Sequence, residues 1–116
     1  MIETEKDKRI IEHIRSHCNK ISKTKERFGS ELSVFESDSD YIDSVLMNLS
    51  QIGELAKLLS EDYVRSTSSS IPWKQIRGLR NVIIHDYNNV ETESIWNTIT
   101  DDIPRLKEFC DAELGS

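Results

Sequence analysis

The sequence predicts an all-α protein, an antiparallel four-helix bundle with one extra short helical turn. Glycine and proline, which interrupt regular structure, number only four and two among 116 residues. Apolar residues recur at intervals of three and four positions instead of alternating, which is the spacing of helices and not of strands. The expected helices are joined by short connections, so consecutive helices should lie antiparallel.

The composition indicates a soluble protein of one domain spanning residues 1–116, because a single core of this size buries roughly two thirds of the surface of its unfolded chain. The apolar runs are too short to cross a membrane, and the charged start is unlike a signal peptide, so we expect a cytoplasmic protein without membrane contact. The formal net charge of -6 argues against a protein that coats nucleic acid. Any RNA site must therefore be a local basic pocket.

The first helix is expected from about Thr4 to Thr24. Its apolar residues form one stripe at the helical period: Ile10, Ile11, Ile14, Cys18 and Ile21. His13 and His17 have the i, i+4 spacing of a metal-binding pair, but no third ligand is evident, so we interpret them as structural and expect no metal. Cys18 and Cys110 match no ligand spacing and should be reduced core residues.

Gly29 to Ser39 forms a polar connection with a short apolar patch, where the extra helical turn is expected. Asp38-Ser39-Asp40 then supplies the N-cap of a long second helix through about Arg65. Its main apolar face comprises Tyr41, Ile42, Val45, Leu49, Ile52, Ala56, Leu59 and Tyr63, with Leu46, Leu55 and Leu58 outside it. Apolar residues on more than one side, with Gly53 allowing close approach, indicate a central helix or one shared with another subunit.

After a flexible polar loop at Ser66 to Ser70, Pro72 suits the first turn of a third helix from Trp73 to about Asp86. The last helix is expected from about Glu91 to Leu114, with Pro104 as a kink. Its core face comprises Ile95, Trp96, Ile99, Ile103, Leu106, Phe109 and Cys110.

The third helix contains an RxxxxHxY pattern formed by Arg80, His85 and Tyr87. It combines a permanently charged phosphate-binding fork, a side chain that titrates near neutral pH and a phenol. Such a set suits cleavage of a phosphodiester without a metal or other cofactor.

Helical periodicity divides the third helix into faces. Ile76, Leu79 and Ile83 should face the core, whereas Lys74, Gly78, Asn81 and His85 share another face with Arg77 at its edge. A phosphate could bind on this second face. Arg80 and His85 are about 140° apart on a straight helix. Either the helix ends or bends near His85, or a second copy of the chain completes the site, and a homodimer is the more economical explanation.

Each motif residue also has an ordinary structural interpretation. Arg80 could pair with Glu54 or Glu61, and His85 could simply favour a helix C-terminus through the helix dipole. Tyr87 could pack as a capping aromatic, and Asn81 could cap or bond locally.

Nearly the entire chain resembles the HepT-like group of the HEPN superfamily, small proteins encoded beside minimal nucleotidyltransferases. Asn48 to Lys57 is similar to the family's NLxxIGEAAK helix, and Ile71 to Asn81 to its IPWxxIxGxRN segment. Val90 to Pro104 is similar to its VxxxxxWxxxxxDIP ending, with RxxxxHxY between these segments.

The resemblance implies a HEPN-like homodimer whose motif helices meet at a cleft, acting as a metal-independent ribonuclease toxin. The antitoxin would be a cognate nucleotidyltransferase that transfers AMP to Tyr87. His85 would act as general base or acid and Arg80 would stabilise the phosphorane, giving a 2',3'-cyclic phosphate. Asn81 would orient the phosphate or the histidine, and Lys74 and Arg77 would support RNA binding.

Two other interpretations remain open. A non-catalytic subunit that presents a substrate to a nucleotidyltransferase, or regulates it, agrees better with the acidic net charge. A purely structural bundle would neither cleave RNA nor bind such a partner.

Overall fold

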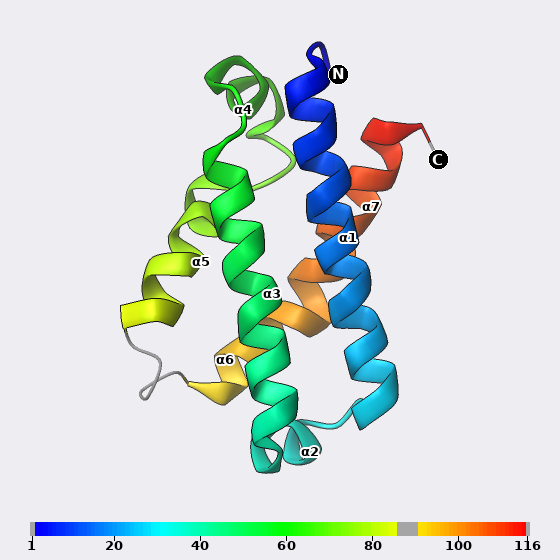
Figure 1. Cartoon of the computed structure of the whole chain (residues 1–116), viewed down its shortest axis with the longest axis vertical. Coiled ribbons are helices and arrows are strands. Elements are labelled where there is room, and N and C mark those ends of the chain that lie inside the picture. Colours follow the sequence, from blue (N-terminus) through cyan, green and yellow to red (C-terminus); the bar gives the residue numbers. More distant parts are fainter. Residues whose placement is uncertain (1, 86–90, 116) are drawn as a thin grey trace.

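The computed structural model describes the backbone of residues 2–85 and 91–115, and all their side chains except those of residues 80–85 (Figure 1). Within these ranges the protein is all-helical, as the sequence predicted, and no residue is in a strand. None of the helices described is long and apolar enough to cross a membrane. The molecule measures 43 × 30 × 21 Å.

Four long rods form the bundle, and two short helices connect them. The first three rods are α1 (Glu5–Phe28), α3 (Ser39–Lys57) and α5 (Trp73–His85). The fourth consists of α6 (Thr92–Asn97), the π-helical turn η2 (Thr98–Asp102) and α7 (Ile103–Leu114). The short helices are α2 (Leu32–Ser37) and α4 (Glu61–Thr67). α1 packs on α3 and α7, and α3 packs on α5, so α3 lies between α1 and α5 (Figure 1).

The first helix follows its predicted pattern. Thr4 caps it, because its hydroxyl oxygen accepts a hydrogen bond of 3.0 Å from the backbone N–H of Asp7. The predicted apolar stripe is buried throughout. α1 ends at Gly29, whose φ of 119° lies in the region that favours glycine.

The predicted long second helix is wrong beyond Lys57, because the chain turns at Leu58 to Ser60 and starts the separate helix α4. The hydroxyl oxygen of Ser60 accepts the N–H of Tyr63 at 3.2 Å and so caps α4. Ser60 is itself fixed by Asp7, whose carboxylate accepts its backbone N–H at 2.9 Å and its hydroxyl at 2.6 Å. Leu59 and Tyr63 are nevertheless buried as predicted.

The predicted loop at Ser66 to Ser70 is partly wrong, since Ser66 and Thr67 are the last residues of α4. Thr67 is buried because its hydroxyl donates to the carbonyl of Tyr63 at 2.7 Å and accepts the indole N–H of Trp73 at 2.8 Å. This pair of bonds anchors the start of α5, which begins at Trp73 as predicted.

The last predicted helix has the expected extent but is interrupted by η2, a turn of π-helix. Pro104 follows directly and lies in the first turn of α7. Proline has no N–H to donate to the carbonyl four residues earlier, and its ring clashes with that carbonyl, so the preceding turn widens. The predicted kink at Pro104 is therefore present as a π-helical turn.

The structural interpretation is confirmed for His17 and for both cysteines. His17 Nδ1 lies 2.8 Å from Asn48 Oδ1, which joins α1 to α3, whereas His13 is exposed. Cys18 and Cys110 are both buried and free. Burial raises the pKa of both thiols, that of Cys110 to about 12, so both stay protonated at neutral pH.

Candidate active site

α5 carries most of the predicted site as one α-helix from Trp73 to His85. The structure confirms the helical backbone on which the predicted grouping of Lys74, Gly78, Asn81 and His85 on one face depends. The side chains of Arg80, Asn81 and His85 lie outside the description, and Tyr87 lies outside the described residues. The geometry between the reactive groups therefore stays a prediction.

The outer face of α5 is open beside Lys74. Lys74 is exposed, and a Cβ added to Gly78 would meet no atom within 4 Å. Glycine inside a helix costs roughly 0.5–1 kcal/mol relative to alanine. Because no neighbour among the described residues requires a glycine here, the position leaves space on this face of the helix.

Arg77 is engaged at the junction between α3 and α4. Its Nε donates to the carbonyl oxygen of Ala56 at 3.1 Å, and a terminal nitrogen lies 3.4 Å from the carboxylate of Glu61. Ala56 is in the last turn of α3, where carbonyls lack partners within the helix and a cation is favourable. The structure thus directs this guanidinium toward α3 and α4 instead of toward Lys74. Glu61, one of the two acids considered as a partner of Arg80, forms an ion pair with Arg77.

α5 is a local basic segment in an acidic protein. Between Trp73 and His85 the sequence contains Lys74, Arg77 and Arg80 but no aspartate or glutamate, while the whole chain has a net charge of -6. The helix that carries the motif is therefore richer in positive charge than the chain as a whole.

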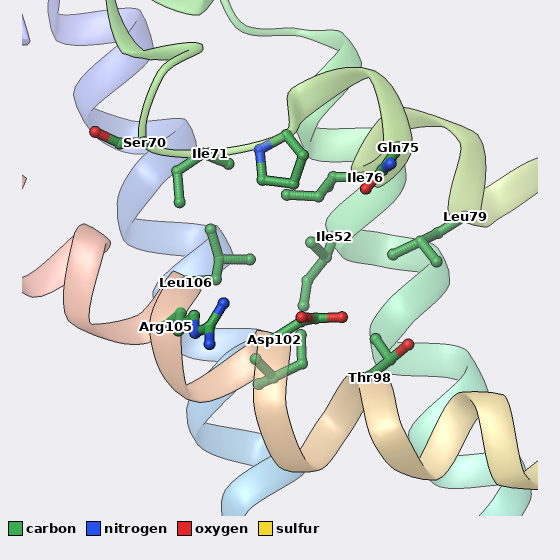
Figure 2. A pocket seen from close by; sticks show the side chains of 12 residues that line it. Ile52, Ser70, Ile71, Gln75, Ile76, Leu79, Thr98, Asp102, Arg105 and Leu106 are labelled. Atoms are coloured by element: carbon green, nitrogen blue, oxygen red, sulfur yellow. The ribbon is translucent and has the colours of Figure 1, made fainter.

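Sequence reasoning missed a pocket of about 250 Å³ on the side of α5 that faces the last rod (Figure 2). Its walls are apolar, formed by Ile52, Ile71, Pro72, Ile76, Leu79, Ile103 and Leu106. Its polar rim includes Gln75 from α5 with Asp102 and Arg105 from the last rod (Figure 2). The sequence signal for it was weak, because the pocket depends on the spacing between α5 and the last rod.

These features define a class of protein, a small all-helical bundle with a basic helix that contains Arg80 and His85 five positions apart. A family profile described as "Ribonuclease HepT-like" matches residues 8–113. The chain belongs to this HepT-like family of the HEPN superfamily, as the resemblance indicated.

Relatives agree with the assignment. The chain is 34% identical over 99 residues to "Putative RNase TTE0752" of Caldanaerobacter subterraneus, covering 84% of this chain and 85% of the relative. It is 30% identical over 89 residues to "Putative RNase MJ1380" of Methanocaldococcus jannaschii, covering 69% and 81%. It is 36% identical over 64 residues to "Probable ribonuclease HepT" of Thermococcus cleftensis, covering 55% and 57%. No solved structure matches the chain significantly.

Proposed function

We propose that this protein is a ribonuclease toxin of a toxin–antitoxin pair, which cleaves RNA without a metal through Arg80 and His85. The observation that carries the proposal is α5 itself, one acid-free helix with the RxxxxH spacing inside a chain of the HepT-like family. Relatives named as ribonucleases support the reaction class.

The proposed reaction uses the RNA's own 2'-hydroxyl as nucleophile. His85 removes its proton, or protonates the departing 5'-oxygen, while Arg80 stabilises the charge that develops on the phosphorane. Asn81 orients the phosphate or the histidine, and Lys74 attracts the backbone electrostatically. The products are a 2',3'-cyclic phosphate and a 5'-hydroxyl.

A homodimer is the proposed active form. On the straight helix α5, positions 80 and 85 are about 140° apart, so a second copy would bring an arginine of one subunit to a histidine of the other. Gly78 leaves space on α5 for such an approach. Met47 on α3 and Leu58, its C-cap residue, are 63% and 55% exposed, about 20° apart around the helix axis, and offer apolar surface for the contact.

The proposed antitoxin is a minimal nucleotidyltransferase that transfers AMP from ATP to Tyr87. The phenol oxygen attacks the α-phosphate, pyrophosphate leaves, and the phenol proton passes to solvent or a base of the transferase. The new phosphodiester carries a negative charge beside the basic helix. This negative charge would repel the phosphate backbone of RNA. Mass spectrometry after reaction with the partner and ATP should find the added AMP on Tyr87, and label on another residue would reject this step.

The second candidate function is a non-catalytic subunit that presents a substrate to a nucleotidyltransferase or regulates it. The acidic net charge of the chain is the observation that favours it.

RNA cleavage in EDTA distinguishes the two functions. We expect the wild-type protein to cleave RNA, and the His85→Ala and Arg80→Ala variants each to lose roughly 100-fold or more in rate, the range of acid–base and electrostatic groups. Lys57→Ala, at an exposed residue of α3, is the matched control and should cleave normally. No cleavage by the wild-type protein would favour the non-catalytic subunit, and unchanged cleavage in both variants would reject the site.

A further inference from the structure

α1 carries a row of exposed polar residues that the proposed active site does not use. Successive members are alternately three and four positions apart: Lys6, Arg9, His13, Ser16, Lys20, Lys23 and Arg27. We name these seven residues the α1 row. At about 100° and 1.5 Å per residue they form one continuous strip roughly 31 Å long.

The α1 row faces away from the body of the bundle. Ile11, Ile14 and Cys18, on the other side of α1, are fully buried where it packs on α3 and α7. Since α3 lies between α1 and α5, the row is on the opposite side of the bundle from the motif helix (Figure 1).

The cations of the α1 row have few partners in the described part of the chain: Arg27 lies over the ring of Phe28 at 5.4 Å, and Lys6 interacts electrostatically with the carboxylate of Asp7. None of its five cations forms an ion pair there, whereas Arg15, Arg65, Arg77 and Lys107 all do. Glu5, Glu12 and Glu26 border the row on one side, with Glu5 about 40° and Glu12 about 60° around the helix from Arg9, and Glu26 about 60° from Lys23, but none of them forms an ion pair with a member of the row in the described part of the chain. Like charges three and four positions apart repel each other and weaken a helix. The row therefore weakens the helix by repulsion between like charges, and no ion pair in the described part of the chain offsets this cost.

The chemistry of the row fits a phosphate backbone better than a protein surface. Every member can donate a hydrogen bond, and arginine, lysine and serine are among the side chains that contact phosphates in nucleic-acid complexes. Successive members are roughly 5 Å apart along the helix. The row contains no aromatic or aliphatic anchor of the kind that dominates protein interfaces.

We propose that the α1 row is a second RNA-binding surface that contacts the phosphate backbone of long or folded RNA. This inference rests on the proposed ribonuclease function and defines its substrate class. The bundle is 30 × 21 Å in its two shorter dimensions, so an RNA that reaches both the row and α5 must extend around it. A short oligoribonucleotide at the motif cannot also contact the row.

The binding test uses bulk tRNA and protein with His85→Ala, which prevents cleavage. In this background the row variant Lys20→Gln/Lys23→Gln/Arg27→Gln removes three cations. If each contacts a phosphate, the slope of log K against log salt should become shallower by about 2, and binding at 0.1 M salt should weaken about 100-fold. The control Lys8→Gln/Lys57→Gln/Arg65→Gln removes the same charge from exposed residues outside the row and should bind normally.

Cleavage by protein that retains His85 separates the two proposals. The row variant should cleave tRNA more slowly than the control variant but cleave a short oligoribonucleotide at the wild-type rate. If the wild-type protein cleaves neither RNA, the proposed function fails, while the binding comparison still tests the row. Equal RNA binding by the row and control variants would overturn the inference. A row variant that binds RNA normally but no longer binds an acidic protein would also overturn it.

Discussion

Replacing Arg77 tests whether this residue is a structural clamp between helices or a direct contact for RNA. Its guanidinium is bound within the fold, which favours the clamp. Replacing it with methionine keeps much of the side-chain stem and removes the hydrogen bond to the Ala56 carbonyl and the ion pair with Glu61. A hydrogen bond from a charged donor contributes about 1.5–3 kcal/mol. Glu61 is 74% exposed, so the ion pair adds only about 0–1 kcal/mol.

We therefore expect Arg77→Met to lower the free energy of unfolding by about 2 kcal/mol, and Glu61→Gln to lower it by less than about 0.5 kcal/mol. For a chain of this length the first change corresponds to a fall in Tm of roughly 6–12 °C. Urea and thermal unfolding of both variants measure the difference.

RNA cleavage by the same variants completes the test, at a temperature where each is folded. A clamp predicts that Arg77→Met cleaves within roughly twofold of the wild-type rate per folded molecule, since the guanidinium is directed toward α3 and α4. An unchanged Tm combined with a large loss of RNA binding would refute this reasoning and make Arg77 a phosphate ligand.

The other predictions concern Gly78 and Asp7. Gly78→Phe should leave the isolated subunit folded, because a Cβ added at this position meets no atom within 4 Å in the described part of the chain, but light scattering should detect dissociation of the dimer; a dimer that persists unchanged would place the interface elsewhere. Burial alone would raise the pKa of Asp7, but hydrogen bonds from Ser60 outweigh it and lower the pKa below its ordinary 3.8. Asp7 thus stabilises the fold above about pH 4, and this contribution is lost as pH falls through the lowered pKa. Asp7→Asn should cost about 1–2 kcal/mol at pH 7 and progressively less under acid, whereas a gap independent of pH would contradict this role.

Much of the fold was predictable because its determinants are local. The stripe of α1, the cap at Asp38 and the start of α5 at Trp73 all follow from residues a few positions apart. The break after Lys57 was not predictable from local residues, because the carboxylate that holds Ser60 belongs to Asp7, 53 residues away.

In the candidate site too, features set by nearby residues were predictable and features set by distant residues were not. The sequence placed Lys74, Arg80 and His85 on one helix, and α5 confirms the backbone of that prediction. The sequence did not reveal the hydrogen bond and ion pair of Arg77, because its partners Ala56 and Glu61 come from α3 and α4. The pocket beside Ile76 and Leu79 also depends on how two rods are spaced, which no local pattern encodes.

Mixing two inactive variants tests the shared dimeric site most directly. Arg80→Ala and His85→Ala subunits are each purified, mixed, allowed to exchange and assayed for RNA cleavage in EDTA. If Arg80 of one subunit acts with His85 of the other, half the dimers are mixed and each has one intact site, so about a quarter of wild-type activity should return. Exchange demonstrated by mass, with no recovery of cleavage, would contradict a site shared between subunits.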